Sequence, residues 1–275
     1  MARRNADRTT RRRRKSREGG RVDDLDLDFS LSPTTWDFLH DDSFVRGIMG
    51  PVGSGKSYAC CADIFLRAIK QAPSKRDGIR RTRFAVIRNI YPELRTTTLK
   101  TWQEIFPESQ FGEMRWSPPI THHIQLPPRG DAAVIDCEVI FLALDQPRDT
   151  RRVLSLELTG AFVDECRELP KVIVDALTSR VGRYPSKADG GPTWRGVWMC
   201  TNPPDDDHWY YTLSEKEKPR GGKYGWRFFR QPGGVIEGDA GAQDAIFAAG
   251  RHWICLLSTS PSPRERTRAR LPSSA

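Results

Sequence analysis

A glycine-rich run near residue 50 carries the residue types and spacing of a phosphate-binding loop. Residues 50–57 read GPVGSGKS and match the pattern G-x-x-x-x-G-K-[ST]. Glycines let the backbone curl until successive N–H groups point at one anion, and a helix that begins at the lysine adds the positive end of its dipole. The pattern predicts a triphosphate site formed by Gly50, Pro51, Val52, Gly53, Ser54, Gly55, Lys56 and Ser57.

Two side chains of this loop have distinct chemistry. The Lys56 ammonium is expected to reach the β and γ phosphates of ATP, and the Ser57 hydroxyl is expected to occupy one position on Mg²⁺. Phosphate binding alone does not give hydrolysis, because the reaction also needs a carboxylate that holds the metal ion and a group that activates water. The sequence must therefore supply acidic residues from another element.

An acidic pair ends the apolar run LTGAFVDE at residues 158–165. Asp164 suits the Mg²⁺ shell, and Glu165 suits a base that orients and deprotonates the attacking water. The alternative is that both residues cap the next helix, where negative charge is favourable. Because the chain already carries the phosphate loop, we interpret Ser57 and Asp164 as metal ligands and Lys56 and Glu165 as catalytic residues.

Two other nucleotide-dependent classes fit the sequence less well. A GTPase would read guanine with an Asn/Thr-Lys-x-Asp string, and the nearest string, SKAD at residues 186–189, stands in a Gly/Pro-rich stretch and does not follow a strand. A small-molecule kinase would usually lack the adjacent Asp-Glu pair and carry a mobile Arg-rich lid. The arginines here are scattered, so neither class is favoured.

Apolar runs recur at intervals that suit strands separated by helices, and these elements must position the two motifs. Several runs are short, do not alternate and are rich in Val, Ile and Phe, as buried parallel strands are. The pattern predicts an α/β fold of the P-loop NTPase type (RecA/ASCE-like), with a mostly parallel sheet sandwiched by helices. Strands are expected at 44–49, 84–89, 134–144, 158–165, 196–202 and 226–231, and helices at 57–70, 93–105 and 168–180.

Positive charge gathers at both ends of the chain, whose net charge is +9. Residues 1–21 hold ten Lys or Arg against two acidic residues, so the central part is close to neutral. We expect residues 1–42 to form a basic disordered arm and an acidic linker that closes on a short helix near 36–39. Residues 43–255 are expected to form the ATPase domain, and residues 256–275 a disordered tail. The arm is either a solubilising tail or an electrostatic contact with nucleic-acid phosphates.

The cysteines and the hydropathy of the chain argue against metal-binding, membrane and secreted proteins. The six cysteines include no C-x-x-C pair and no histidine at zinc-like spacing, so we expect reduced core thiols and no metal site among them. No apolar run approaches 18 residues and no signal peptide is recognisable, which predicts a soluble intracellular protein. Aromatic residues interleave with charge at 208–211 and 224–230, and we interpret both segments as buried strands, not as base-stacking surfaces.

Three further stretches, taken with GPVGSGKS, carry a resemblance to a known family. They are VIRNIYPELRTTTLKTWQEIFP at 86–107, LALDQPRDTRRVLSLELTGAFVDECRELPKVIVDALTSRVGRYP at 142–185 and MCTNPPDDDHWYY at 199–211. In this order the motifs resemble the ATPase domain of a tailed-phage terminase large subunit over roughly residues 43–250.

The resemblance implies a homo-oligomeric ring on a portal vertex in the host cytoplasm, where ATP hydrolysis moves double-stranded DNA. The implied partners are the portal protein and the terminase small subunit. The TNPP segment matches the family's coupling motif, which links loss of the γ phosphate to subdomain motion. Thr201 and Asn202 occupy that motif here, and the alternative is a proline-stabilised turn with an asparagine cap.

The chain departs from the family pattern in two ways. Some relatives carry an arginine finger inside the phosphate loop, but positions 51, 52 and 54 here are Pro, Val and Ser. We therefore expect the finger to come from elsewhere, such as a neighbouring subunit. Full-length members also carry a C-terminal nuclease, and residues 203–255 are too few to hold it, so we expect no nuclease activity. Candidates for the finger are Arg88, Arg95, Arg180 and Arg183.

Two functions remain as alternatives to a packaging motor. One is a nucleotide-gated module that binds DNA or assembles with a partner without productive hydrolysis. The other is a helicase-like P-loop ATPase, against which the absence of a recognisable second ATPase domain argues. Phosphate release with and without linear DNA separates the first alternative from a motor.

Overall fold

Six strands of the computed structural model coincide with the runs expected from the sequence. The model describes residues 32–127, 133–219, 221–222 and 225–232, so the predicted basic arm and C-terminal tail lie outside the described residues. The ends of the six strands agree with the expected runs to within a few residues. They are β1 (Val45–Met49), β2 (Arg80–Arg88), β5 (Ile135–Ala143), β6 (Gly160–Val163), β7 (Gly196–Thr201) and β8 (Trp226–Arg230).

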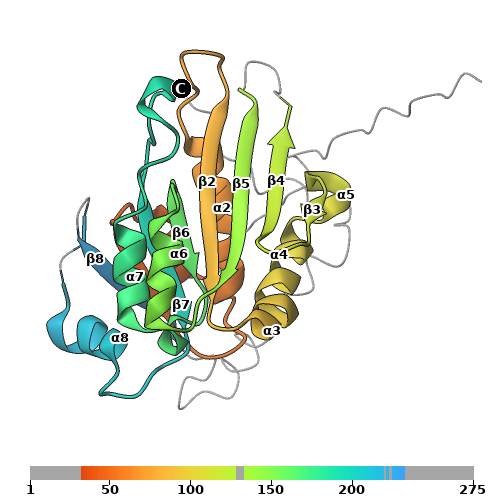
Figure 1. Ribbon diagram of the computed structural model, residues 1–275. Coiled ribbons are helices and arrows are strands. Elements are labelled where there is room, and N and C mark those ends of the chain that lie inside the picture. Colours follow the sequence, from red (N-terminus) through yellow and green to blue (C-terminus); the bar gives the residue numbers. More distant parts are fainter. Residues whose placement is uncertain (1–31, 128–132, 220, 223–224, 233–275) are drawn as a thin grey trace, which may run out of the picture.

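Two strands at one edge were not expected. They are β3 (Met114–Arg115) and β4 (Ile120–Leu126), and β4 runs antiparallel to both β3 and β5. Its sequence ITHHIQL alternates between buried and outward residues, and the search for unalternating apolar runs missed it. The described strands form one sheet in the order β3-β4-β5-β2-β6-β7-β1-β8 (Figure 1). All strands from β5 to β8 in this order, which are β5, β2, β6, β7, β1 and β8, run parallel to one another. The predicted mostly parallel sheet is therefore confirmed.

Helices cover both faces of the sheet, as predicted (Figure 1). One layer contains α1 (Pro33–His40), α2 (Lys56–Lys70), α4 (Leu99–Ile105) and α5 (Glu108–Phe111). The other contains α6 (Thr150–Leu154), α7 (Lys171–Thr178) and α8 (Trp209–Tyr211). Short helical turns extend some of these helices or link strands: α3 (Tyr91–Glu93), the π-helical turns η2 (Leu94–Thr98) and η6 (Thr212–Glu217), and the 3₁₀ turns η3 (Pro147–Asp149), η4 (Cys166–Glu168) and η5 (Lys187–Asp189).

Two expectations for aromatic segments have different outcomes. The segment at 224–230 contains strand β8, but its burial is only partial. The segment at 208–211 is the beginning of a helix, so the expected strand is wrong there. His208 caps this helix by accepting a hydrogen bond from the Tyr210 backbone N–H, and the Tyr210 ring is fully buried. A side-chain cap starts a helix, which the count of apolar residues alone does not reveal.

Successive residues of the central strands belong to two apolar clusters, one on each face of the sheet. In β2, Phe84 and Val86 join the cluster beneath α2, whereas Ala85 and Ile87 join the cluster beneath α6 and α7. Each large apolar side chain buried in this way contributes about 1.5–3 kcal/mol to folding. Helix α1, expected at the end of a linker, places Phe38 in the first cluster. The two-sided burial explains why these strands read as continuous apolar runs.

A buried ion-pair network joins β1 to α2. Arg46 of β1 is fully buried and donates to Asp63 at 2.5 Å and to the Phe38 carbonyl oxygen at 2.6 Å. Arg67 donates to the second carboxylate oxygen of Asp63 at 3.2 Å and also pairs with Asp42. The Arg67 guanidinium stacks on the ring of Trp194, at 4.3 Å from the ring centroid. Each guanidinium of this network therefore pairs with a carboxylate, with Asp63 in the interior and Asp42 at the surface.

The described cysteines are buried, as expected. Cys60, Cys61, Cys137, Cys166 and Cys200 carry free thiols, and Cys255 lies outside the described residues. Within the described residues, no helix has the length and apolar character needed to cross a membrane.

Strand β7 lies between β1 and β6, which sets the position of the predicted motifs. The strands are parallel, so the residues that follow them meet at one edge of the sheet. Gly50 follows β1, Asp164 follows β6 and Asn202 follows β7. Backbone hydrogen bonds continue past the strand ends, from Gly50 N–H to the Thr201 carbonyl oxygen and from Asp164 N–H to the Ile87 carbonyl oxygen. The fold therefore brings the phosphate loop, the acidic pair and the TNPP segment together.

Candidate nucleotide-binding site

The loop between β1 and α2 uses its glycines for different reasons. Gly53 and Gly55 have φ angles of +76° and +77°, in the left-handed region that disfavours other residues. A Cβ at either position would meet open space, so only the backbone conformation demands glycine there. A Cβ on Gly50 would lie 2.6 Å from the Cβ of Gln231, so close packing of the chain demands glycine at that position. Val52 at the loop is 84% exposed.

Lys56, the first residue of α2, folds back over the loop. Its Nζ donates to the Pro51 carbonyl oxygen at 2.6 Å and to Ser54 Oγ at 3.2 Å, and it lies 3.4 Å from Asn202 Oδ1. These three partners are neutral, so the ammonium makes no hydrogen bond to a negatively charged atom. Burial lowers the pKa of Lys56 below its ordinary value, although nearby negative charge such as that of Glu165 opposes the shift. An anion bound here would give the buried ammonium a directly hydrogen-bonded negative partner and so reduce the cost of its burial.

Ser57 and Asp164 come together from α2 and the end of β6. The Ser57 hydroxyl donates to Asp164 Oδ1 at 2.9 Å, and Asp164 is only 3% exposed. A hydroxyl and a carboxylate oxygen are the hard ligands that Mg²⁺ prefers. The hydroxyl oxygen keeps lone pairs for a metal ion while its O–H group donates a hydrogen bond to the carboxylate. The chemistry of these donors fits the predicted metal ligands.

Glu165 has an unusual backbone and two well-placed partners. Its φ of 47° and ψ of 56° lie in the left-handed region, which is uncommon for a residue other than glycine. Its Oε2 accepts a hydrogen bond from the Asn202 backbone N–H and its Oε1 accepts one from Asn202 Nδ2, both at 3.2 Å. Residues held in such conformations cluster at functional sites, because the surrounding structure must stabilise them.

Asn202 connects the lysine to the glutamate. Its side-chain oxygen faces Lys56 and its side-chain nitrogen donates to Glu165, so one amide contacts both predicted catalytic residues. Thr201 is fully buried at the end of β7, and its hydroxyl donates to the Asn202 carbonyl oxygen at 2.9 Å. The structure therefore brings together Lys56, Ser57, Asp164, Glu165 and Asn202, with Thr201 beneath the last of them.

Two residues that contact this group were missed in the sequence. Thr98 donates to Asp164 Oδ2 at 2.5 Å, and Cys200 donates to Asp164 Oδ1 at 3.1 Å. Thr98 is one of three adjacent threonines in a helical segment, and nothing in the local pattern distinguishes it. Cys200 directly precedes the TNPP segment, and this position next to Thr201 could have indicated that it lies near the site.

Among the four arginines considered as fingers, Arg88 pairs with a residue of the turn that follows the acidic pair. It is the last residue of β2, is 6% exposed, and pairs with Glu93 at 2.7 Å and Glu168 at 3.2 Å. Its Nε and Nη1 atoms are buried and have no hydrogen-bond partner among the described residues. Arg95 lies over the ring of Trp116, with 5.7 Å to the ring centroid.

The other two candidates lie near the amino ends of the parallel strands, away from the nucleotide site. The Arg180 carbonyl oxygen accepts a hydrogen bond from the Leu158 backbone N–H, which precedes the start of β6. Arg183 donates through Nε to the Ser179 carbonyl oxygen at 3.1 Å. Because Asp164 follows the other end of β6, neither arginine belongs to the nucleotide site of its own chain.

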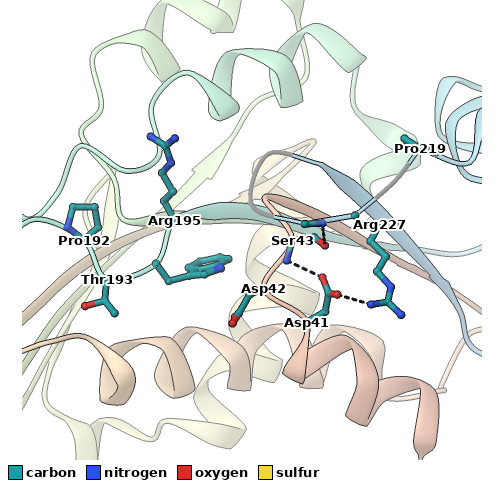
Figure 2. A pocket seen from close by; sticks show the side chains of 11 residues that line it. Asp41, Asp42, Ser43, Pro192, Thr193, Arg195, Pro219 and Arg227 are labelled. Atoms are coloured by element: carbon teal, nitrogen blue, oxygen red, sulfur yellow. Dashed lines mark hydrogen bonds and ion pairs between the residues drawn. The ribbon is translucent and has the colours of Figure 1, made fainter.

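A cavity of about 880 Å³ also lies near the amino ends of the strands (Figure 2). Ser43 and Arg195 precede β1 and β7, so the cavity is at the amino ends of these strands. Asp41 on its wall accepts from the Ser43 backbone N–H at 2.8 Å and pairs with Arg227 at 2.7 Å. The cavity is therefore separated from Lys56 by the length of the strands and forms no part of the nucleotide site.

Solved structures with similar chain traces come from phage terminases. One large terminase from a thermophilic bacteriophage is 14% identical with a TM-score of 0.48, over 72% of this chain and 45% of that chain. Its complex with ATP-gamma-S gives 13% identity and a TM-score of 0.49, over 73% of this chain and 44% of that one. The ATPase domain of the Thermus phage P74-26 large terminase is 12% identical with a TM-score of 0.44, over 81% and 85% of the two chains.

The chain spans less than half the length of the large terminase chains from the thermophilic bacteriophage. A comparison with curated proteins gave no match. The profile of the family described as "Terminase large subunit, T4likevirus-type, N-terminal" matches residues 47–230, which is more than half of the chain and includes the phosphate loop, the acidic pair and the TNPP segment. The chain therefore belongs to the family of N-terminal regions of T4-like terminase large subunits.

Proposed function

We propose that this chain is the ATP-hydrolysing motor subunit of phage DNA packaging, and that it moves double-stranded DNA into a procapsid. The observation that carries the proposal is the 2.9 Å hydrogen bond between Ser57 Oγ and Asp164 Oδ1, which joins the phosphate loop to the acidic strand end. The large terminase of the thermophilic bacteriophage has been solved with ADP and with ATP-gamma-S, which supports nucleotide binding by this family.

Each residue of the site has a role in attack of water on the γ phosphate. Backbone N–H groups of residues 50–57 and the Lys56 ammonium bind the phosphates and neutralise charge as it develops. Ser57 and Asp164 would hold Mg²⁺, which would supply positive charge to offset the negative charge of the phosphates. Glu165 orients the attacking water and accepts its proton.

Asn202 provides the coupling between chemistry and motion. Both oxygens of Glu165 accept hydrogen bonds from Asn202, and each keeps a second lone pair, so a water bound by Glu165 would lie next to Asn202. To bind a phosphate, Lys56 must exchange one of its present acceptors, which are the Pro51 carbonyl oxygen, Ser54 Oγ and Asn202 Oδ1. A change at either residue alters a contact of Asn202, and Thr201 holds the Asn202 backbone. Gain and loss of the γ phosphate would therefore shift the segment after β7.

The remaining partners follow from the proposed motor. We propose that copies of the chain assemble as a ring in the host cytoplasm, with the portal protein and the terminase small subunit as partners. An arginine from a neighbouring copy would complete the charge stabilisation, because the phosphate loop itself contains none. The basic residues 1–21 are a candidate contact with DNA, and binding through them would weaken as salt rises.

Phosphate release with and without linear double-stranded DNA tests this function. The measurement uses the full 275-residue chain over a range of concentrations, since assembly shifts such equilibria by mass action. A motor should show Mg²⁺-dependent release that DNA stimulates and that Glu165→Gln abolishes. Nucleotide-dependent DNA binding without any turnover would indicate the gated binding module instead. Strand separation of a short duplex would indicate a helicase-like enzyme.

A further inference from the structure

Three consecutive threonines in the connection between β2 and α4 make different contacts. The Thr96 hydroxyl donates to the Pro92 carbonyl oxygen at 2.9 Å and the Thr97 hydroxyl to the Glu93 carbonyl oxygen at 2.7 Å, so both bond within their own helix. Both residues are exposed. Thr98 is 1% exposed and donates across the fold to Asp164 Oδ2 at 2.5 Å. Only the third threonine reaches the acidic strand end.

A π-helical turn places Thr98 there. Turn η2 covers Leu94–Thr98, and the Leu99 backbone N–H donates to the Leu94 carbonyl oxygen. This five-residue turn interrupts the α-helical repeat, and both Thr98 and Leu99 are 1% exposed. Leu99 belongs to the apolar cluster beneath α2, while Thr98 contacts the carboxylate. Single π turns are rare and frequently occur at functional sites, which is consistent with a specific task for this one.

The Asp164 carboxylate is held by donors from three separate elements. Its Oδ2 accepts from Thr98 of η2, and its Oδ1 accepts from Ser57 of α2 and Cys200 of β7. A carboxylate with only the last two donors would be fixed at one oxygen and could rotate about its bond to Cβ. The Thr98 hydroxyl occupies the second oxygen, so that Oδ1 stays directed toward Ser57.

We propose that Thr98 is the positioning residue that orients Asp164 for Mg²⁺ binding. The inference rests on the proposed ATPase function, since it assigns a task within the same site. Mg²⁺ requires near-ideal octahedral geometry, so it tolerates little rotation of its ligands. Residues that orient metal ligands typically change metal affinity by about 10- to 100-fold when they are replaced. Thr98 acts on the metal ion through Asp164 and does not itself touch the nucleotide.

The test compares Thr98→Val with Thr97→Val in the full chain. Both changes replace a hydroxyl by a methyl group in the same helical segment, but only the first removes a donor to Asp164. Mn²⁺ serves as the metal probe, and its binding is titrated by electron paramagnetic resonance in the presence of ATP-gamma-S. Thr98→Val should weaken Mn²⁺ binding by about 10- to 100-fold, and Thr97→Val should leave it at the wild-type value.

Two further variants keep the test decisive if Thr98→Val does not fold. Thr98→Ser retains the hydroxyl and should restore wild-type Mn²⁺ affinity. Thr98→Ala removes the hydroxyl without adding bulk and should reproduce the loss. Metal-free nucleotide binding should be the same in all these variants, because Lys56 and the loop backbone are untouched. A merely structural role would weaken metal-free binding as well.

The outcomes separate this inference from the proposed function. If wild-type chain and Thr97→Val bind Mn²⁺ with nucleotide and Thr98→Val or Thr98→Ala binds it equally well, the positioning role is wrong while the nucleotide site stands. If the wild-type chain binds no Mn²⁺ with nucleotide, the proposed ATPase function itself fails. The Mg²⁺ concentration for half-maximal phosphate release should rise in parallel with the Mn²⁺ dissociation constant.

Discussion

Helix α2 contributes charged residues to two clusters. In one cluster the charged groups bond to neutral partners, and in the other they pair with opposite charges. Near its first turn, Lys56 donates to neutral oxygens, and Glu165 nearby accepts from an amide. Farther along, Asp63 and Arg67 belong to the buried network with Arg46, in which each charge faces an opposite charge. A structural network is neutralised within the protein, whereas a binding site leaves charge for its ligand to neutralise. The difference predicts that mutations in the two clusters have opposite effects on activity and stability.

The largest expected effect comes from Glu165. Glu165→Gln keeps the size of the side chain and one of the two oxygens that accept from Asn202, but it removes the carboxylate that accepts the proton. Phosphate release should fall by at least about 100-fold, because general base catalysis contributes about 10²- to 10⁴-fold. Binding of ATP should be nearly unchanged. The same substitution at the exposed Glu157 is the control, and turnover retained by Glu165→Gln would show that another group accepts the proton.

The next effect should appear in stability and concerns the buried network. Asp63→Asn leaves the fully buried Arg46 without an opposite charge, which should lower the free energy of unfolding by about 3–5 kcal/mol. Urea unfolding measures the loss. Asp175→Asn is the matched control, since Asp175 pairs with Lys171 at the surface and should contribute at most about 1 kcal/mol. Equal losses in the two variants would contradict the distinction between the clusters.

Lys56 should give the reverse pattern. Lys56→Ala removes a hydrogen bond to a charged phosphate, which is worth about 1.5–3 kcal/mol, so nucleotide binding should weaken by about 10- to 100-fold and turnover should fall with it. Because the buried ammonium has neutral partners and burial lowers its pKa, its removal should leave the free energy of unfolding unchanged or higher. Isothermal titration and urea unfolding of the same variant measure both quantities. A large loss of stability would show that Lys56 stabilises the fold, as the residues of the buried ion-pair network do.

The smallest expected effect concerns a buried group that is neutral. His122 accepts from Trp102 Nε1 through Nδ1 at 2.9 Å and contacts the Gly112 carbonyl oxygen through Nε2 at 3.0 Å, which fits a neutral ring protonated at Nε2. Burial lowers the pKa of His122 below its ordinary value of 6.5. The unfolded chain then binds the proton more readily, so stability is complete above about pH 6.5 and declines as the pH falls below it.

The decline cannot exceed about 1.4 kcal/mol per pH unit for this single group. Urea unfolding between about pH 5.5 and 7 measures it in the wild-type chain and in His122→Gln, which should lose this part of the slope. His123→Gln is the neighbouring control, because His123 is exposed on the same strand. An unchanged slope in His122→Gln would mean that His122 does not titrate differently in the folded protein.

The sequence predicted the elements whose signals are local. The phosphate loop combines glycine at fixed offsets with a helix start. Strands β1, β6 and β7 are buried on both faces, as are the last five residues of β2, so these elements can be recognised in a short window. Strand β4 was missed because one of its faces is polar, and its buried His122 reads as a surface residue until Trp102 is placed beside it.

Contacts across the sheet account for what the sequence could not predict in the site. Thr98 and Asp164 are far apart in the chain, and their hydrogen bond depends on the π turn that directs Thr98 inward. The amide of Asn202 between Lys56 and Glu165 depends on β7 lying between β1 and β6, an arrangement of strands and not a motif. The residue types could be predicted, but their partners came from the topology.

The close contact between Gly50 and Gln231 has a mechanical consequence. Gln231 follows β8, and its backbone N–H donates to the Met49 carbonyl oxygen at 2.7 Å, while its side chain lies where a Cβ on Gly50 would be. Gln231 is therefore hydrogen-bonded to the last residue of β1 and packed against the first residue of the phosphate loop. A displacement of the loop on nucleotide binding would therefore also displace Gln231 and the end of β8, because there is no free space between Gly50 and the Gln231 side chain.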